Sequence, residues 1–459
     1  MELFIVFVFI LGYLGITLEH SLKVDKLVPS LLMMAFAWAG VSIGLDDFTM
    51  WFNSAGHELM DITGMGSEDR SALMESTLLH HFGKTTEILI FLIGAMTIVE
   101  IIDHFHGFSA IKGFIRTNKK RTLLWIVAFL AFLLSAIIDN LTATIVLITI
   151  LRKLLSKSED RIWFAGIIII CANAGGAWSP IGDVTTTMLW MGNKVTALKL
   201  VEYLFLPSLI CMLIPTFVAS FMKPFKGNFE LPIEEGEVNS KASLMLYLGL
   251  GMIVFVPIFK TIFELPPYIG MMLSLGVVAL FAETISVRQF KMSYVGVVKK
   301  DEKIENSQEK TDEHHESPTF RALTRIEMPS ILFFLGILMT VAALESLGLV
   351  FNFGQSVQSS MREDVFVLLL GAGSAVIDNV PLVAASMGMF NEPIDDHIWQ
   401  FIAYSAGTGG SMLIIGSAAG VVAMGMERIS FFWYLKNMSW LALIGYLAGA
   451  GFYLLERGL

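Results

Sequence analysis

Two short polar clusters interrupt apolar stretches of this chain, half a chain apart. The first, residues 135–144, contains an acid, an amide and several hydroxyls, and its Asp139-Asn140 pair returns as Asp378-Asn379 in residues 374–379. An ionisable side chain inside hydrocarbon costs roughly 2.5–3.5 kcal/mol on insertion scales, so acids at such positions indicate function. These acids are candidates for binding a cation or a proton.

A second pair of interruptions is rich in glycine. Residues 173–187 read Asn-Ala-Gly-Gly-Ala-Trp-Ser-Pro-Ile-Gly-Asp-Val-Thr-Thr-Thr, and residues 407–417 read Gly-Thr-Gly-Gly-Ser-Met-Leu-Ile-Ile-Gly-Ser. Glycine and proline break helical hydrogen bonding, which frees backbone carbonyls to face a cavity. The predicted breaks are at Gly175, Gly176, Pro180, Gly409 and Gly410. The first segment has an acid, Asp183, and the second has none.

Oxygen-rich side chains at these interruptions suit a hard cation such as Na⁺, which takes carboxylate, amide and hydroxyl ligands. Burial and neighbouring acids favour a protonated carboxyl group, whereas a bound cation favours the ionised form. Sodium and a proton would therefore compete for the same oxygens. The candidate residues are Asp139, Asn140, Thr142, Asp183, Thr185, Thr186, Asp378 and Asn379, with Na⁺ expected at Asp139, Asp183 and Asp378. Helix capping is an alternative role for several of them.

The composition places these residues in a membrane protein. The chain has 459 residues, of which 55% are hydrophobic and 16% charged, whereas soluble domains have roughly 25% charged residues. The net charge of −10 and the lack of a basic stripe argue against nucleic acid as a partner. Cys171 and Cys211 both lie in apolar stretches, so we expect neither a disulfide nor a metal site from them.

The apolar runs predict an all-α polytopic fold of about ten spanning helices and two re-entrant hairpins. Simple spans are expected at 2–18, 27–44, 86–103, 203–222, 243–260, 266–285, 326–348 and 431–455, broken helices at 162–192 and 398–426, and hairpins at 122–151 and 364–390. Residues 45–85 form a long connection with two weakly amphipathic pieces, around 46–60 and 68–83, that could lie at the membrane interface.

Charge flanking the segments supports the hairpins. The segment 122–151 is basic at both ends, which places both ends in the cytoplasm by the positive-inside rule. With the N-terminus outside and both hairpins in place, cytoplasmic segments carry 24 of the 31 Lys and Arg residues. The two halves then match element for element in opposite orientation. Inverted repeats with broken helices are a secondary-transporter architecture, with the site between the repeats.

The chain resembles the NhaD-type sodium/proton antiporters of the ion transporter superfamily. The resemblance rests on Thr86-Glu87-Ile88 with Gly94–Asp103, Ile138–Thr144, Gly175–Thr186 and Ile377–Val383, and it covers essentially the whole chain. It implies export of Na⁺ and Li⁺ in exchange for H⁺, as part of pH homeostasis, by an elevator mechanism. It also implies a homodimer held by a static scaffold.

The resemblance adds site residues and domain roles. It extends the candidate site to Asn173, Ser374, Ser411 and Ser417, with Glu87 as an accessory residue. Glu87 and Glu100 flank the third span, where an interfacial role competes with an accessory one. The implied parts are 1–121 (scaffold, first repeat), 122–226 (transport, first repeat), 227–242 (linker), 243–362 (scaffold, second repeat, with a mobile cytoplasmic loop at 286–325) and 363–459 (transport, second repeat).

Two other functions compete with cation exchange. An anion carrier of the same superfamily, for arsenite or a dicarboxylate, would need a neutral or positive site, but no Lys or Arg lies inside a predicted span near the tips. An intramembrane hydrolase could use Asp139 and Asp378 as an acid pair, although no lid or water-activating motif supports it. We expect no enzymatic activity and no cofactor, with the lipid bilayer of the cell (inner) membrane as the surroundings.

Overall fold

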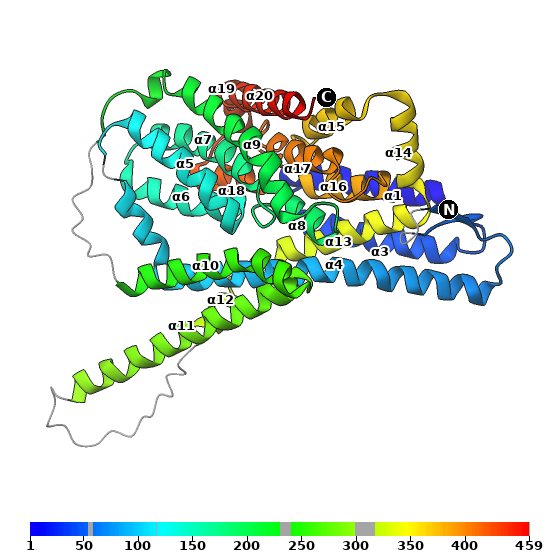
Figure 1. Cartoon of the computed structure of the whole chain (residues 1–459), viewed down its shortest axis with the longest axis horizontal. Helices are drawn as coiled ribbons and strands as arrows, with labels where there is room; N and C mark the ends of the chain where they lie inside the picture. Colours follow the sequence, from blue (N-terminus) through cyan, green and yellow to red (C-terminus); the bar gives the residue numbers. More distant parts are fainter. Residues whose placement is uncertain (54–57, 116, 230–239, 299–316, 459) are drawn as a thin grey trace. The chain divides into compact units, whose positions relative to one another are not determined.

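The computed structural model describes residues 1–53, 58–115, 117–229, 240–298 and 317–458 (Figure 1). The chain divides into two compact units. The larger unit contains Met1–Leu89, Ile115–Glu234 and Met328–Leu459, and the smaller one contains Ile90–Phe114 and Glu235–Glu327. Each unit is described by itself below. Every candidate acid of the site belongs to the larger unit, apart from Glu100.

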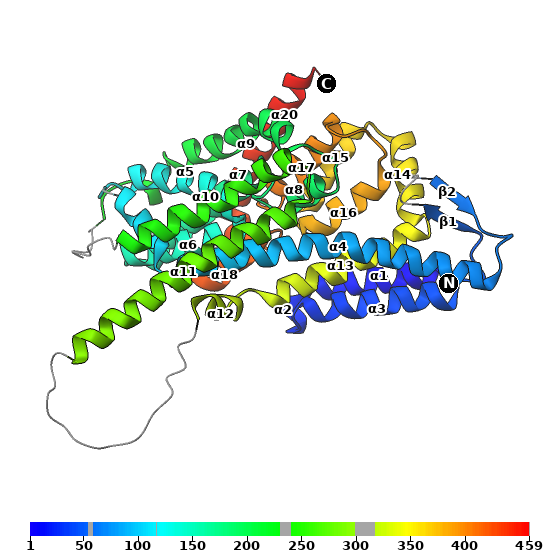
Figure 2. The ribbon, with the colours of Figure 1, turned by 60° about the horizontal axis from the view of Figure 1, so that its bottom comes forward.

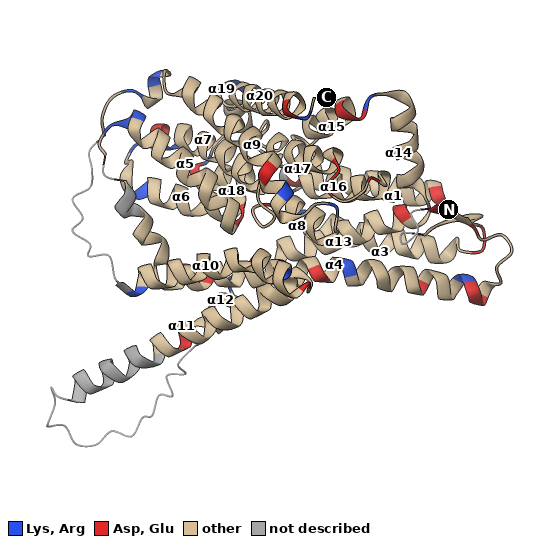
Figure 3. Cartoon of the chain, in the orientation of Figure 1, with Lys and Arg blue, Asp and Glu red and all other residues tan. Residues whose placement is uncertain are grey.

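Seven helices of the described residues are long and apolar enough to cross a membrane. They are α4 (Ser67–His104), α5 (Lys120–Ile138), α9 (Ala197–Ala219), α10 (Ser240–Phe263), α11 (Pro267–Val298), α13 (Met328–Ser346) and α20 (Ser439–Arg457). The apolar helices α1 (Glu2–Thr17) and α3 (Leu27–Ile43) have 16 and 17 residues, a little below the length of a typical span. Charged side chains lie mostly at helix ends and in connections (Figure 3). The protein is an all-α, multi-pass membrane protein.

In the larger unit, α1, α3 and α13 pack together. Ile5, Ala37 and Ala343 belong to their buried hydrophobic core. A short helix, α2 (Glu19–Leu22), connects α1 to the loop before α3. Inside a bilayer such helices associate mainly through close van der Waals packing, because the lipid tails are as apolar as the side chains themselves.

The connection after α3 contains a short two-stranded antiparallel sheet. Strands β1 (Met50–Asn53) and β2 (Glu58–Asp61) pair antiparallel, with Met50 opposite Asp61 (Figure 2). The buried Arg70 donates hydrogen bonds to the carbonyl oxygens of Leu45 (2.8 Å), Phe48 (2.9 Å) and Ile62 (2.8 Å). These long-range bonds satisfy carbonyls that would otherwise lack partners in the turn.

The predicted interfacial piece at 68–83 is instead the first half of α4, which runs for 38 residues. No proline interrupts the segment, and Gly83 alone is tolerated inside a helix. The span expected at 86–103 is therefore the second half of a longer helix.

The first hairpin consists of α5 and α6 (Asn140–Leu154), which turn at Asp139. Asp139 adopts a φ of 81°, an unusual value for a residue with a side chain, and it begins α6 as its N-cap. At the other end, Lys120 Nζ lies 2.6 Å from Asp160 Oδ1 at the start of α7 (Ser158–Gly176). The basic N-terminal end of α5 thus lies beside the start of α7.

The second hairpin and the two broken helices follow the same plan. The hairpin consists of α15 (Glu363–Gly373) and α16 (Asn379–Met389), and the broken helices are α7 with α8 (Val184–Met191) and α17 (His397–Gly409) with α18 (Ala418–Glu427). A Cβ atom on Gly175 would collide with the carbonyl oxygen of Phe132, and one on Gly409 with that of Gly371. These glycines therefore let α7 approach α5, and α17 approach α15.

Other parts of the chain depart from the predicted pattern. Helix α14 (Leu349–Ser360), which was not expected, follows α13, and α19 (Phe431–Asn437) precedes α20. In the smaller unit, η1 (Gly107–Phe114) packs on α10, and α11 on α12 (Pro318–Leu323). The cytoplasmic loop expected at 286–325 is helical up to Val298 and again in α12; residues 299–316 lie outside the described residues. Most of the linker 227–242, residues 230–239, does too.

Candidate functional site

Asp183 is the acid at the centre of the candidate site. It follows the irregular segment between α7 and α8, and its side chain is the N-cap of α8, accepting a hydrogen bond from the backbone N–H of Thr185 at 3.1 Å. The residue is only 3% exposed. A buried carboxylate without further partners would be costly, so its other contacts define the site.

Both hairpin tips supply an amide to this carboxylate. Asn140 Nδ2, from the tip of α5 and α6, lies 3.3 Å from Asp183 Oδ2. Asn379 Nδ2, from the tip of α15 and α16, lies 3.1 Å from the same oxygen and 3.4 Å from Oδ1. The repeated Asp-Asn pairs thus meet through their asparagines at a single acid.

Asn173 and Ser417 extend the network to the second broken helix. Asn173 Oδ1 accepts from Asn140 at 3.0 Å, while Asn173 Nδ2 donates to Ser417 Oγ at 3.0 Å. Ser417 in turn is the N-cap of α18, accepting from the backbone N–H of Gly420 at 3.2 Å. We call Asn140, Asn173, Asp183, Asn379 and Ser417 the central polar cluster; all five are buried.

Two threonines follow Asp183 in the first turn of α8. Thr186 Oγ1 donates to the Asp183 carbonyl at 2.9 Å. The buried Thr185 hydroxyl has no hydrogen-bond partner among the residues that the structure describes. An unsatisfied buried hydroxyl needs an explanation, and beside a carboxylate it is an available oxygen ligand.

The predicted serines have different roles. Ser374 Oγ donates to Ala406 O at 2.7 Å, and Ser135 Oγ donates to Ala172 O at 2.6 Å in the first half of the chain. Each serine thus forms a hydrogen bond between a hairpin and the neighbouring broken helix. Ser411 Oγ donates to Thr408 O at 2.6 Å, within the second break. Of the predicted serines, only Ser417 lies in the central polar cluster.

The structure does not gather the three predicted acids around one ion. Asp139 accepts from the backbone N–H of Thr142 at 2.7 Å and from its hydroxyl at 2.9 Å, so both residues serve the start of α6. Asp378 Oδ2 lies 3.4 Å from Lys26 Nζ. No group of three or more His, Cys, Asp or Glu side chains suited to a metal ion exists within the described part of the chain. The three acids therefore do not meet in this structure, and Na⁺ binding at Asp139, Asp183 and Asp378 stays a prediction.

The surroundings of the cluster combine one acid with several helix ends. Half-helices α6, α8, α16 and α18 all begin at or beside it, and each N-terminus carries roughly half a positive charge. Among the described residues, no basic side chain forms an ion pair with Asp183. The ionised acid is thus stabilised by dipoles and amides alone, which leaves its charge available to a mobile cation.

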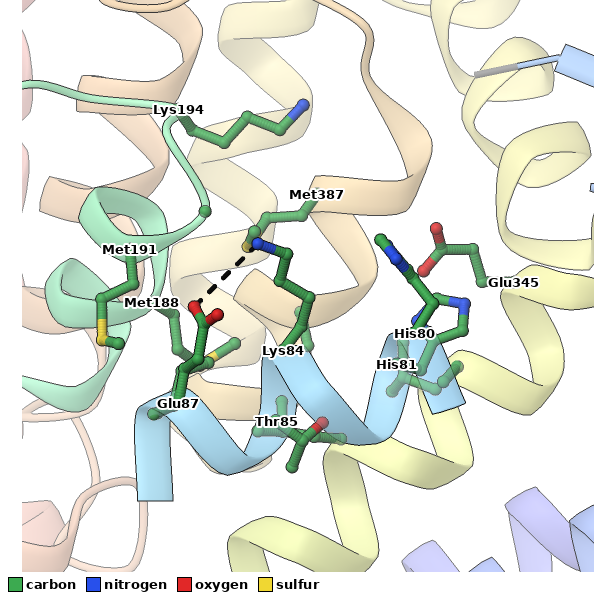
Figure 4. A pocket seen from close by; sticks show the side chains of 16 residues that line it. His80, His81, Lys84, Thr85, Glu87, Met188, Met191, Lys194, Glu345 and Met387 are labelled. Atoms are coloured by element: carbon green, nitrogen blue, oxygen red, sulfur yellow. Dashed lines mark ion pairs between the residues drawn. The ribbon is translucent and has the colours of Figure 1, made fainter. Parts of the chain in front are cut away.

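A cavity of about 250 Å³ lies at the far ends of two of these half-helices (Figure 4). It is bordered by Met188 and Met191 on α8 and by Met387 on α16. An eight-residue helix such as α8 is about 12 Å long. Helices α8 and α16 therefore run from the central polar cluster to this cavity.

Several ionisable side chains also line the cavity. They are His80, His81, Lys84 and Glu87 on α4, Lys194 in the connection after α8, and Glu345 on α13 (Figure 4). Glu87 pairs with Lys84 at 3.9 Å. Burial lowers the pKa of Lys194, and the Glu345 and Glu392 carboxylates oppose that change. Glu87 is thus a cavity residue, while Glu100 belongs to the smaller unit, and the accessory role of both stays a prediction.

Sequence comparisons match most of the chain to transporters. A family model described as "Citrate transporter" matches residues 5–297. The chain is 39% identical to "Sodium/proton antiporter 1" of Arabidopsis thaliana over 98% of this chain and 71% of that protein. It is 36% identical to "Sodium/proton antiporter 2" of the same plant, over 97% of each. Identity to "Na(+)/H(+) antiporter NhaD" of Vibrio cholerae is 31%, over 98% of this chain and 90% of that one.

A solved structure supports the fold. The YdaH transporter of Alcanivorax borkumensis, whose crystal structure is described as having an unusual topology, superimposes with a TM-score of 0.54. The match covers 94% of this chain and 98% of that transporter, at 11% sequence identity. At that identity the likeness concerns the fold alone.

Proposed function

This chain belongs to the NhaD-type sodium/proton antiporters, and on that premise we propose that it exchanges Na⁺ for H⁺ at Asp183. The observation that carries the proposal is the buried Asp183 carboxylate, which both hairpin tips reach with an amide and with which no base pairs among the described residues. A single buried negative charge can be neutralised either by a proton or by a cation. Exchange follows if the carrier moves only in a neutralised state.

The side chains around Asp183 fit both states. When a proton occupies the carboxyl group, the amides of Asn140 and Asn379 remain as hydrogen-bond partners. When Na⁺ binds, the same amides can turn and present their carbonyl oxygens, because an amide carries a donor and an acceptor on one plane. The unpartnered Thr185 hydroxyl adds a further oxygen. Li⁺ is a hard cation as well, and we include it as a substrate.

Matched contacts in the two halves support an inverted-repeat transporter. Ser135 and Ser374 make the same kind of bond from a hairpin to a broken helix, and Asp183 and Ser417 both cap the second half of a broken helix. In such repeats, the site lies between the halves and the two sides of the membrane gain access in turn. We propose that the hairpins and broken helices move together as the transport part of an elevator.

A carboxylate carrier is the second candidate. The family model that matches the chain is described as a citrate transporter, and the N-termini of four half-helices around the cluster are suited to an anion. Against this reading, Asp183 would repel a carboxylate, and no basic side chain pairs with it in the described part of the chain. Citrate therefore serves as the competing substrate in the test.

The test uses everted membrane vesicles that carry the protein and a preset pH gradient. We expect added Na⁺ or Li⁺ to collapse the gradient, and citrate to have no effect. The matched control is Asp183→Asn, which keeps a capping side chain but removes the charge. Citrate uptake without a Na⁺ response from the folded protein would favour the carboxylate carrier and reject exchange.

A further inference from the structure

The two hairpin tips share the order Ile-Asp-Asn but differ three residues after the acid. The first tip has Thr142 there, and its backbone N–H and hydroxyl both donate to Asp139. The second tip has Pro381, which has no N–H to donate. Accordingly, the side chain of Asp378 makes no capping bond to α16. With proline in place of threonine, Asp378 therefore lacks the capping role that Asp139 has in the first tip.

The released carboxylate reaches the N-terminal helices of the larger unit instead. Asp378 Oδ2 pairs with Lys26 Nζ at 3.4 Å, and the two side chains are 17% and 24% exposed. Lys26 precedes the first turn of α3, and its Nζ also lies 4.4 Å from the centre of the Phe333 ring on α13. A cation held over an aromatic face is attracted by it, so the ammonium group is fixed from two sides.

The pair lies at a small cavity of about 50 Å³, which the tip itself helps to line. Ile377 and Asp378 of the tip border it together with Tyr13 of α1 and Ile415 of the second break. The next residue along the tip is Asn379, whose amide donates to Asp183. The position of Asn379 at the acid therefore depends on where Asp378 is held.

We propose that Lys26 is a positioning residue for the cation site. Through Asp378 it holds the tip of the second hairpin where Asn379 reaches Asp183. The inference rests on the proposed function, since it concerns the affinity of that site for Na⁺. Lys26 acts from a helix of the predicted scaffold, so the contact also joins the two parts that the repeat pattern predicts.

The experiment measures the KM and kcat for Na⁺ in everted vesicles for Lys26→Met, Asp378→Asn and the double variant. We expect each single change to raise the KM about three- to tenfold, as loss of a partly buried pair predicts, with kcat within about twofold of the parent. Because the residues act as one pair, the double variant should be no worse than either single one. Lys26→Arg should restore the KM to within about twofold.

The matched control is Lys23→Met, which removes an exposed lysine from the same connection. We expect it to leave the KM unchanged. Should Lys26→Met not fold, Lys26→Gln and Asp378→Asn make the same comparison. A parental KM in folded Lys26 variants overturns the inference. A higher kcat at unchanged KM also overturns it, because the pair would then stabilise one transport conformation rather than the binding site.

A second measurement separates this inference from the proposed function. Na⁺ should raise the melting temperature of the purified parent protein, and the Lys26 variants should need about three- to tenfold more Na⁺ for the same shift. If the parent neither transports nor responds to Na⁺, the proposed function and this inference both fail. If the parent responds and the variants respond equally well, only the inference fails.

Discussion

At the scale of the residue, the structure distinguishes Asp183 from the other two predicted acids. Asp183 alone has the burial and the converging amides that a binding acid needs, and the amides come from both hairpin tips. Asn173 accepts a hydrogen bond from the Asn140 amide and donates one to Ser417, which links the first hairpin tip to the second broken helix. Hydrogen bonds between buried polar side chains restrict their arrangement, so the amides of both tips are directed toward Asp183 in this structure.

The first prediction concerns Asp183→Asn. Asparagine still caps α8, so the free energy of unfolding should change by less than about 1 kcal/mol. Transport should fall at least about 100-fold, because replacing even an outer partner of a bound ion can reduce activity 10- to 100-fold. Vesicle assays and thermal unfolding measure the two effects. Substantial Na⁺ exchange by the folded variant would remove Asp183 from the site.

The second prediction concerns Asp139, where the structure and the sequence interpretation differ. Asp139→Asn should retain at least about half of the transport, because asparagine both caps a helix and tolerates a positive φ. Asp139→Ala should instead lower the free energy of unfolding by about 1–2 kcal/mol. Comparison of the two variants in transport and thermal melts separates capping from ion binding. Loss of Na⁺ dependence in a stable Asp139→Asn protein would restore the three-acid site.

The residue types at the site could be predicted from the sequence, but the partners of the acids could not. Asn140, Asp183 and Asn379 were identified because polar residues are conspicuous in apolar segments. The role of Asp378 depends on Lys26, which lies 352 positions away in the chain. The sequence held one unused signal, namely Pro381 in place of Thr142, which removes the capping donor from the second tip.

At the scale of the element, the breaks are maintained by backbones in close contact. Gly175 meets the backbone of α5, and Gly409 meets the backbone of α15. Rigid backbone atoms cannot move aside as a flexible side chain can, so even one methyl group is too large at these positions. The broken helices therefore keep a fixed register against the hairpins, and this register sets where the tips end.

The third prediction follows from that contact. Gly175→Ala and Gly409→Ala should each lower the free energy of unfolding by about 1–3 kcal/mol through overpacking, although alanine is otherwise the better helix former. The matched control is Gly425→Ala in α18, where nothing lies within 4 Å of an added Cβ. Thermal unfolding in detergent measures all three. Equal stability of the Gly175 and control variants would show that the backbones can separate.

The sequence predicts a helix or a helix break correctly where nearby residues determine the backbone conformation. Apolar runs with Gly and Pro interruptions marked α7, α8, α17 and α18, because both residues act on the local backbone. The fold of residues 45–53 and 58–66 did not follow, since hydrogen bonds from Arg70 at the start of α4 stabilise it. Such non-local hydrogen bonds leave no periodic pattern to recognise.

At the scale of the whole molecule, carboxylates make well-defined contacts at two places in the larger unit. The buried Glu427 at the end of α18 pairs with Arg152 of α6 at 2.7 Å and with Arg161 of α7 at 2.9 Å. In the connection before α17, Asp395 accepts a hydrogen bond from the backbone N–H of Thr196, at the start of α9, at 2.6 Å. The charge distribution predicts that the Glu427 end is cytoplasmic and the Asp395 end is outside. The homodimer and its scaffold stay predictions.

The fourth prediction tests this orientation by cysteine labelling. Cys171 and Cys211 are buried, so a membrane-impermeant maleimide should react only with cysteines introduced at exposed positions. Lys153→Cys lies at the predicted cytoplasmic end of α6, and Asn391→Cys lies in the predicted outer connection before α17; both positions are exposed. In intact bacterial cells that express the chain, the reagent should label Asn391→Cys and spare Lys153→Cys, and everted vesicles should reverse the result. The parent protein, which should stay unlabelled in both preparations, is the control. The opposite pattern would invert the topology, and labelling of both positions from one side would mean that the hairpins do not return to the side from which they enter.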